Sequence, residues 1–281
     1  MQKPFSKERT IEENWKINNI SKSIPIFMIK PIKKNITKAL ILIPGLNGNG
    51  SMIRFFNYNE FDDCLLFSFD PRAQGNNKNK ASRFYKKYVE DIKLLIDEFK
   101  IKNPQIKEIF LCGESWGATL AFLTYKKYSK DIKGVIGWNM PYNVVDVAPE
   151  KGWNKFKKTL KVFITFLTSI NTYDEAPLAD VLTNNKVVKK VIQMVKNNKL
   201  NNKVPIAAWR SFKKSWKVLE NNENLNIKYI QSMEDVMLSK KGLSKIQNIK
   251  NAIIFEKGYH ILTFDDNMSD KLFYEIFNFI L

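Results

Sequence analysis

Short apolar runs alternate along the chain with longer stretches in which apolar side chains recur every three or four residues. Short runs of this kind are typical of strands buried on both faces, and the wider spacing is typical of amphipathic helices. The pattern predicts helices at 82–100, 118–125 and 271–280, and strands at 39–44, 64–70, 109–113, 133–138, 227–232 and 252–256. Strands that alternate with helices predict an α/β fold, in which helices flank a mostly parallel central sheet.

The long helix predicted at 82–100 has one apolar face. That face consists of Phe84, Tyr88, Ile92, Leu95 and Phe99. Because these residues recur at helical spacing, we expect all of them to pack against the sheet. A further helix is expected to begin near residue 51, after the Gly- and Asn-rich turn that follows the first predicted strand.

The alternation stops between 140 and 226, where helical patterns continue but no good strand occurs. An amphipathic stripe runs from Trp153 to Ile170, and a second helix is expected at 186–196. A third helix begins at Pro205, a residue favoured in the first helical turn, and its apolar side would carry Ile206, Trp209, Phe212, Trp216 and Leu219. We therefore predict an α/β core formed by residues 1–140 and 226–281, and an all-helical cap formed by 141–225.

The 281 residues carry a formal net charge of +18, which raises the question of nucleic-acid binding. Nearly all of that charge comes from lysine, whereas base-specific readout relies mainly on arginine, and no nucleic-acid-binding motif is present. The abundance of Lys and Asn fits an AT-rich coding sequence at permissive surface positions, so no nucleic-acid partner is expected. Lys151, Lys155, Lys158 and Lys161, within the first cap stripe, suggest instead that the cap makes peripheral contact with an anionic membrane.

The cysteines and the first residues bear on the cellular setting. Cys64 and Cys112 both lie in apolar runs, with neither a disulfide framework nor metal-ligand spacing. The beginning of the chain is charged and polar, and no apolar run reaches the roughly 18 residues of a transmembrane helix. These features predict a soluble protein of the cytoplasm.

Candidate chemistry centres on the segment from Gly113 to Gly117, GESWG, which matches the G-x-S-x-G nucleophile elbow. In that motif a serine occupies a strained turn between a strand and a helix, and small residues on both sides allow the close backbone approach that the turn needs. An apolar strand precedes the motif here and a helical run follows it. The pattern therefore predicts Ser115 as a nucleophile.

A serine hydroxyl becomes a good nucleophile only when a neighbouring base takes its proton. His260 is the sole histidine, and it follows the last predicted strand, where the chain order serine, acid, histidine requires the base. The acid should follow the preceding strand, at Asp235 or at the adjacent Glu234. The donors to the substrate oxyanion are expected to be the backbone N–H groups of Trp116 and of Leu46, in the turn after the first predicted strand.

Several segments together resemble α/β hydrolases of the monoacylglycerol lipase and lysophospholipase-like group, which includes related serine aminopeptidases. The resemblance runs from about residue 24 to the C-terminus and rests on PGLNGNG at 44–50, DPRAQG at 70–75, GESWG, EDVML at 234–238 and GYH at 258–260. It favours Asp235 over Glu234 as the acid, and it implies that Asp70 braces the loops rather than reacting. Two residues depart from the usual pattern, Pro44 in place of a histidine and Ala73 in place of a glycine, and neither change removes a catalytic group.

The resemblance also implies that the cap, where 182–219 is similar, forms an acyl-binding pocket over the site. The resulting hypothesis is a serine hydrolase that cleaves a fatty-acyl ester, such as a monoacylglycerol or a lysophospholipid, through an acyl-enzyme and without a metal or organic cofactor. The cap residues expected to contact such a substrate are Trp153, Phe156 and Trp209.

Two other hypotheses remain. An aminopeptidase or amidase on the same scaffold would need acidic groups near its pocket, and the cap has one tight acidic cluster, formed by Asp174, Glu175 and Asp180. A catalytically inactive binding protein is disfavoured, because such proteins usually lose a triad member and all three are present here.

Overall fold

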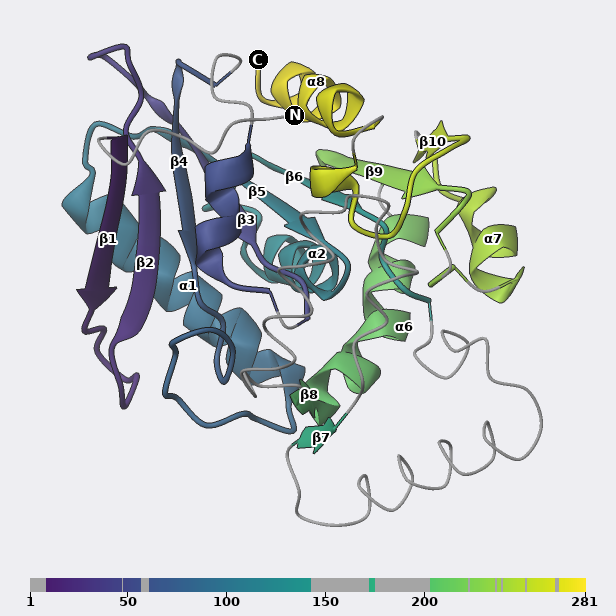
Figure 1. Cartoon of the computed structure of the whole chain (residues 1–281), viewed down its shortest axis with the longest axis horizontal. Coiled ribbons are helices and arrows are strands. Elements are labelled where there is room, and N and C mark those ends of the chain that lie inside the picture. The colour runs from purple at the N-terminus through teal and green to yellow at the C-terminus, as the bar shows by residue number, and fades with distance from the viewer. Residues whose placement is uncertain are drawn as a thin grey trace.

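The central feature of the molecule is an eight-stranded sheet in the order β1-β2-β4-β3-β5-β6-β9-β10 (Figure 1). The computed structural model describes residues 9–46, 48–56, 61–142, 172–174, 203–221, 223–235, 237–238, 240–250, 252–265 and 268–281. The sheet strands are β1 (Thr10–Trp15), β2 (Ile24–Ile29), β3 (Lys38–Ile43), β4 (Cys64–Phe69), β5 (Glu108–Glu114), β6 (Gly134–Trp138), β9 (Ile227–Ser232) and β10 (Ala252–Phe255). The strands from β4 to β10 in this order pair in parallel, whereas β1 and β2 pair antiparallel to each other and β2 to β4. The predicted α/β fold with a mostly parallel sheet is confirmed.

Each strand predicted from the apolar runs is present, with both ends within one residue of the prediction. The central strands are easy to predict because both of their faces are covered by other elements. In β5, for example, Ile109 and Leu111 face one core while Phe110 and Cys112 face the other, as the alternation of strand side chains requires. The hydrophobic pattern gave no prediction for β1 and β2.

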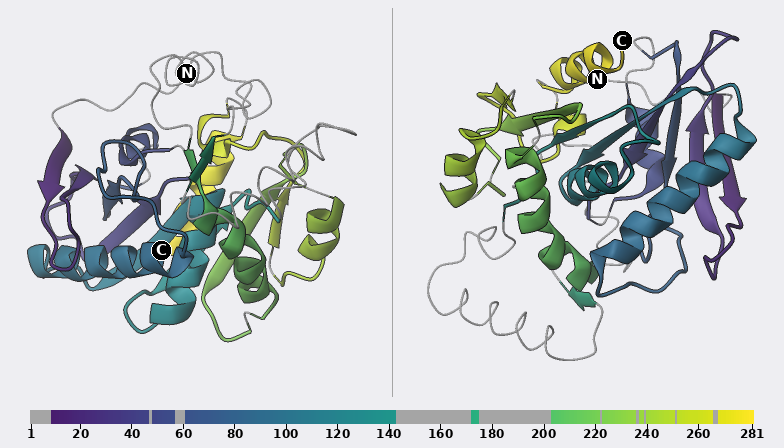
Figure 2. Two further views of the ribbon diagram at one scale, coloured as in Figure 1. Left: turned by 90° about the horizontal axis from the view of Figure 1, so that it is seen from below. Right: turned by 180° about the vertical axis from the view of Figure 1, so that it is seen from behind.

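Helices cover both faces of the sheet (Figures 1 and 2). On one face, α1 (Tyr85–Lys102), α2 (Trp116–Tyr128) and α6 (Ile206–Glu220) share a core with the sheet. The 3-10 helix η2 (Gly50–Phe55) and α8 (Ser269–Ile280) pack on the opposite face, over a second core. The two shorter helices of the C-terminal part are α7 (Lys240–Ile246) and the 3-10 helix η5 (Leu262–Phe264).

Helix α1 follows its predicted stripe except at the first position. Tyr88, Ile92, Leu95 and Phe99 are buried, but Phe84 is 62% exposed, so the prediction that it packs against the sheet was wrong. The helix begins only at Tyr85, and the extended backbone of Phe84 turns its side chain out of the stripe. The ring of Phe84 instead lies below the guanidinium of Arg210, at 5.5 Å.

The predicted cap range, 141–225, contains an element that the sequence did not indicate. Two short strands, β7 (Thr172–Asp174) and β8 (Lys203–Pro205), form an antiparallel pair, which corrects the expectation of an all-helical segment. Strands of three residues are too short to leave a hydrophobic pattern. The helices expected at 153–170 and 186–196 lie outside the described residues.

Helix α6 begins at Ile206, one residue after the predicted start, since Pro205 ends β8, and it packs on α2 in the layer that covers the sheet. Its predicted apolar side is buried at Ile206, Phe212, Trp216 and Leu219. The indole Nε1 of Trp216 donates to the backbone oxygen of Pro141 at 3.1 Å, which fixes the helix against the end of the segment after β6.

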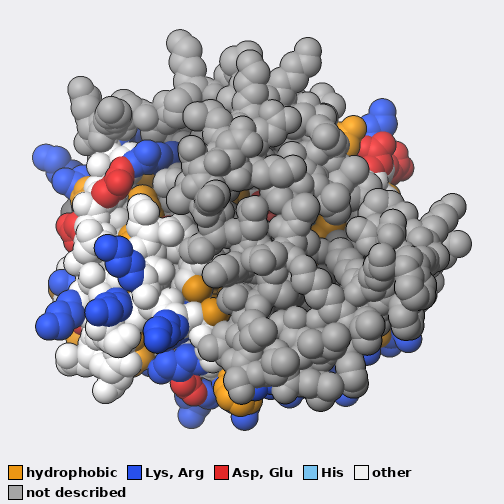
Figure 3. All heavy atoms as spheres, turned by 60° about the horizontal axis from the view of Figure 1, so that its bottom comes forward, with side chains coloured by type: hydrophobic (Ala, Val, Ile, Leu, Met, Phe, Trp, Pro, Cys, Tyr) orange, Lys and Arg blue, Asp and Glu red, His pale blue; other side chains and the backbone are white. Residues whose placement is uncertain are grey.

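The outer surface is rich in positive charge. On the face shown in Figure 3, Lys and Arg side chains are spread over the described part, with few acidic side chains among them. Within the described ranges, no helix has both the length and the apolar composition needed to cross a membrane.

Candidate active site

Ser115 occupies a sharp turn between β5, which ends at Glu114, and α2, which begins at Trp116. Its φ of 57° and ψ of −121° lie in a region that residues other than glycine rarely adopt. Two glycines make the turn possible: a Cβ on Gly117 would lie 1.9 Å from the backbone oxygen of Ile43, and one on Gly113 would lie 2.4 Å from the carbonyl carbon of Gly117. The strain and the glycine requirement are those of a nucleophile elbow.

The structure brings Ser115, His260 and Asp235 together from three separate loops. His260 Nε2 lies 2.9 Å from Ser115 Oγ, and His260 Nδ1 lies 2.9 Å and 3.0 Å from the two carboxylate oxygens of Asp235. All three side chains are buried. Glu234, the other candidate for the acid, points elsewhere and accepts the backbone N–H of Gly258 at 3.0 Å.

The surroundings of His260 favour its charged form. Burial lowers the pKa of the imidazole, but the charge and the hydrogen bond of Asp235 raise it, and the charge of Glu114 adds to them. The net effect is a pKa above the usual value of about 6.5. An imidazole stabilised in this way is able to take a proton from a serine hydroxyl.

Asn139, which the sequence analysis did not single out, joins the acid loop to the histidine loop. It follows β6 with a left-handed φ of 48° and is fully buried. Its amide nitrogen donates to the backbone oxygens of Tyr259 and His260, both at 2.9 Å. Its amide oxygen accepts the backbone N–H of Ser232 at 2.9 Å and the side-chain amide of Gln231 at 3.2 Å.

Gln231 extends this network to the acid itself. Its side-chain amide also donates to Asp235 Oδ2 at 3.2 Å, and its side-chain oxygen accepts the hydroxyl of Tyr229. Asp235 Oδ1 accepts the backbone N–H of Met237 at 2.8 Å. These contacts hold the carboxylate in place against the imidazole. The sequence offered one signal for this network: Asn139 is a polar residue directly after the buried strand β6, and loops at the carboxyl ends of parallel strands meet at one edge of the sheet.

The two predicted oxyanion donors belong to the two segments that adjoin Ser115. Trp116 is the first residue of α2, and Leu46 lies in the turn after β3. That turn approaches the nucleophile closely, since a Cβ on Gly45 would lie 3.4 Å from the Cβ of Ser115. The neighbouring Asn47 lies outside the described residues.

Asp70 braces the loops around this turn, as the resemblance implied. Its two carboxylate oxygens accept the backbone N–H groups of Gly50 at 2.8 Å and Asn76 at 2.7 Å. Burial raises the pKa of Asp70, although these two hydrogen bonds oppose the rise. Next to it, Arg72 pairs with Asp91 of α1 through two hydrogen bonds of 2.8 Å and 3.0 Å.

The side chain of Trp116 has a packing role. It is fully buried, makes an edge-on contact with Tyr88 and donates its indole N–H to Ser211 Oγ at 3.1 Å. Helix α6 is thereby connected to the elbow. Of the residues predicted to contact substrate, Trp209 belongs to α6 but its side chain is outside the described part of the structure, as are Trp153 and Phe156.

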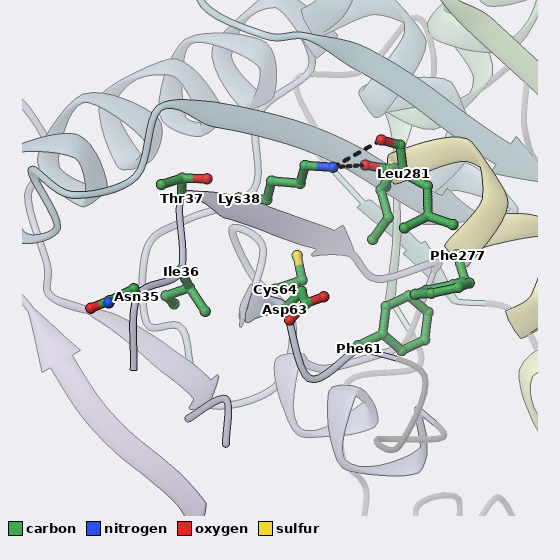
Figure 4. Close-up of a pocket in the computed structure, with 10 residues that line it drawn as sticks. Asn35, Ile36, Thr37, Lys38, Phe61, Asp63, Cys64, Phe277 and Leu281 are labelled. Atoms are coloured by element: carbon green, nitrogen blue, oxygen red, sulfur yellow. Dashed lines mark hydrogen bonds between the residues drawn. The ribbon is translucent and has the colours of Figure 1, made fainter. Parts of the chain in front are cut away.

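A cavity of about 210 Å³ lies at the other end of the sheet, where β3 and β4 begin (Figure 4). Lys38 lies on its wall and donates to the backbone oxygens of Ile280 and Leu281 at 2.8 Å and 3.0 Å. None of the residues that line it belongs to the Ser115 site. Within the described ranges, no group of His, Cys, Asp and Glu side chains could hold a metal ion.

A mostly parallel sheet covered on both faces, with a serine elbow after one of its central strands, defines an α/β hydrolase. Residues 35–267 match the model of the protein family described as serine aminopeptidase, S33, and the chain belongs to this family of hydrolases. No curated protein sequence matches the chain significantly.

Solved structures with this fold include lipases and epoxide hydrolases. A soluble variant of monoglyceride lipase from Saccharomyces cerevisiae is 15% identical, with a TM-score of 0.73 over 99% of this chain and 97% of that chain. The monoacylglycerol lipase of Paleococcus ferrophilus is 15% identical, with a TM-score of 0.65 over 86% and 93% of the two chains. An epoxide hydrolase from Vigna radiata is also 15% identical, with a TM-score of 0.62 over 98% and 99%. At these identities the likeness shows the fold alone.

Proposed function

We propose that the chain hydrolyses carboxylic esters, with Ser115 as nucleophile, His260 as general base and Asp235 as the acid that orients and stabilises the imidazole. The observation that carries this proposal is the unbroken chain of hydrogen bonds from Ser115 Oγ through the two ring nitrogens of His260 to the carboxylate of Asp235. This order of groups activates a serine hydroxyl in unrelated hydrolases.

The acylation half of the reaction follows from the positions of these groups. Ser115 Oγ attacks the ester carbonyl carbon while His260 Nε2 takes the hydroxyl proton, and Asp235 stabilises the resulting imidazolium. The carbonyl oxygen becomes an oxyanion, to which the backbone N–H groups of Leu46 and Trp116 donate. One such donor is worth about 3–4 kcal/mol of transition-state stabilisation in other hydrolases. The intermediate then collapses, the alcohol leaves with the proton from His260, and the acyl group remains on Ser115.

Deacylation repeats the sequence with water in place of serine. His260 takes a proton from a water molecule, whose oxygen attacks the acyl carbon, and the second tetrahedral intermediate is held by the same donors. Ser115 leaves and recovers its proton from the imidazolium, which releases the carboxylic acid. No step needs a metal or an organic cofactor.

Within this reaction class, we propose a fatty-acyl ester such as a monoacylglycerol or a lysophospholipid as the substrate. This proposal is supported by the two lipases among the solved structures that share the fold over 99% and 86% of this chain. Trp153, Phe156 and Trp209 remain the candidates for acyl-chain contacts. Three of the six tryptophans, Trp153, Trp209 and Trp216, lie in the cap range and offer apolar lining for an acyl channel.

Two other activities occur on this scaffold. Aminopeptidase or amidase activity is the second candidate, because the family description names a serine aminopeptidase. Its mechanism would use the same three residues with an amine as leaving group. Epoxide hydrolysis through a covalent intermediate is disfavoured, because it requires a carboxylate nucleophile where this chain has Ser115.

Hydrolysis of an ester series tests the proposal. The series runs from acetyl to palmitoyl esters of one chromogenic alcohol, with a monoacylglycerol, a lysophospholipid and aminoacyl anilides measured in parallel. We expect activity to peak at medium or long acyl chains, and Ser115→Ala to lower kcat by several orders of magnitude, as loss of a triad member does elsewhere.

Ser211→Ala is the matched control, because it removes a buried serine hydroxyl that contacts the indole of Trp116 rather than the imidazole. It should retain most of the activity. Equal activity in wild type and Ser115→Ala would contradict the role of Ser115, and turnover of the anilides alone would establish the aminopeptidase alternative.

A further inference from the structure

Glu114 is a buried carboxylate that the triad does not use. It is the last residue of β5, directly before the nucleophile, and it is 5% exposed. Its Oε1 accepts the indole N–H of Trp138 at 2.8 Å. The same oxygen lies 3.5 Å from the backbone nitrogen of Thr263 and 3.4 Å from its hydroxyl, both of which donate to it.

These donors come from two different elements, so Glu114 connects three parts of the site. Trp138 ends β6, and Thr263 lies in η5, three residues after His260. The carboxylate therefore ties the loop that carries the base to the strand that carries the nucleophile. Ser115 and His260 lie 145 positions apart in the chain, so only contacts between distant segments, of the kind that Glu114 makes, can hold their side chains within hydrogen-bond distance.

The buried position of the Glu114 carboxylate also has to be explained. Burying a carboxylate is costly unless a cation or several donors compensate it. Its hydrogen-bond donors are neutral, and among the described residues the ionisable group whose charge acts on it is His260. An apolar residue would fill the space without that cost, so the carboxylate has a use in the site.

We propose that Glu114 is a positioning residue of this hydrolase: its carboxylate holds the His260 loop against the nucleophile elbow and supplies a second negative charge that stabilises the imidazolium. The catalytic part of this role rests on the proposed ester hydrolysis. The coupling between Glu114 and His260 is a property of the protein alone and can be measured without substrate.

The electrostatics of the pair agree with the geometry. Burial raises the pKa of Glu114, and the hydrogen bond from Trp138 and the charge of His260 oppose the rise. The charged groups that face His260 are Asp235, from the loop after β9, and Glu114, from β5. On the histidine's own loop, Asp265 accepts the backbone N–H of Tyr259 at 3.0 Å.

The sole histidine makes the coupling directly observable. In protein carrying no affinity tag of histidines, every imidazole NMR signal belongs to His260, so its titration curve needs no assignment. We expect Glu114→Gln, which keeps an acceptor oxygen but removes the charge, to lower the pKa of His260 by about one pH unit. The acid limb of kcat/KM should move in the same direction.

Glu108→Gln is the matched control, because Glu108 begins the same strand and pairs with Lys133 at 3.2 Å, far along β5 from the site. It should leave the His260 titration unchanged. An unchanged titration in Glu114→Gln overturns the proposal, as does an equal shift in Glu108→Gln, which would reflect net charge alone.

Trp138→Phe keeps the test decisive if Glu114→Gln fails to fold. The substitution removes the indole N–H, which makes the shortest hydrogen bond to the Glu114 carboxylate. The carboxyl group then stays protonated to higher pH, so its negative charge stabilises the imidazolium of His260 less. The pKa of His260 should fall again, and a constant pKa overturns the proposal. If the titration shifts as expected while no ester is hydrolysed, the proposed function fails and the coupling of Glu114 to His260 stands.

Discussion

At the scale of single residues, Asn139 shows how much of the site depends on one side chain outside the triad. Its two amide hydrogens meet the backbone oxygens of Tyr259 and His260, and its amide oxygen meets two donors from the end of β9. Every hydrogen-bonding position of the side chain is therefore used. Because it is fully buried, no water can replace a lost partner without rearrangement.

Asn139→Asp should be strongly disruptive although it changes a single atom. A carboxylate oxygen would face two carbonyl oxygens, so two acceptors lose a donor and a buried charge is repelled. We expect a loss of about 2–5 kcal/mol in the free energy of unfolding and at least about a tenfold fall in kcat, measured by urea unfolding and by ester hydrolysis. Asn18→Asp, at an exposed position in the turn after β1, is the control and should change stability by less than about 0.5 kcal/mol. Similar behaviour of the two variants would contradict the assigned role.

At the scale of elements, α6 is the helix that links the cap range to the core. Its buried residues pack against α2, and Trp116 joins the two helices through Ser211. Phe212 is 1% exposed, so Phe212→Ala should lower the free energy of unfolding by about 3–5 kcal/mol through lost burial and the cavity left behind. The exposed neighbour Lys213→Ala is the control in the same denaturation experiment and should be nearly neutral. A small effect at Phe212 would mean that α6 is docked only loosely.

The elements also show what the sequence could predict and what it could not. The strands from β3 to β10 that are buried on both faces leave continuous apolar runs, so their positions were predictable. β1, with the sequence TIEENW, lies at the sheet edge with four of its six residues polar, and β2 contains Pro25, which argues against a strand interior. β2 joins the sheet by pairing with β4, and β1 joins it by pairing with β2, and no local sequence pattern specifies these contacts between segments.

The same limit applies to the candidate site. Ser115, His260 and Asp235 each follow a predicted strand, and a recognisable motif or a unique residue type marks the first two. Glu114, Asn139 and Gln231 carry no such mark, because their importance comes from hydrogen bonds between loops that are distant in the chain. Local sequence patterns predict elements and reactive groups, whereas the partners that hold those groups emerge only from the packed fold.

At the scale of the whole molecule, the excess of positive charge has two competing explanations. A formal net charge of +18 creates a positive field that would attract anionic substrates and speed their encounter with the site. Alternatively, the lysines only solvate the surface. The two explanations differ in their dependence on salt, because the screening length falls from about 30 Å at 0.01 M to about 10 Å at 0.1 M.

A pair of esters distinguishes these explanations. Both carry the same medium-length acyl chain, but one has a phosphate-bearing head group and the other a glycerol head group. Both are kept below the concentration at which they aggregate. If the field guides substrate, kcat/KM of the anionic ester should fall several-fold as ionic strength rises from 0.01 M to 0.3 M, since encounter contributes to kcat/KM but not to kcat. The neutral ester is the internal control and should vary by less than about twofold. A parallel decline of both would mean that salt acts on the enzyme itself, whereas constant values for both would leave the lysines a surface role only. A selective decline would favour anionic lysophospholipids over neutral monoacylglycerols as substrates.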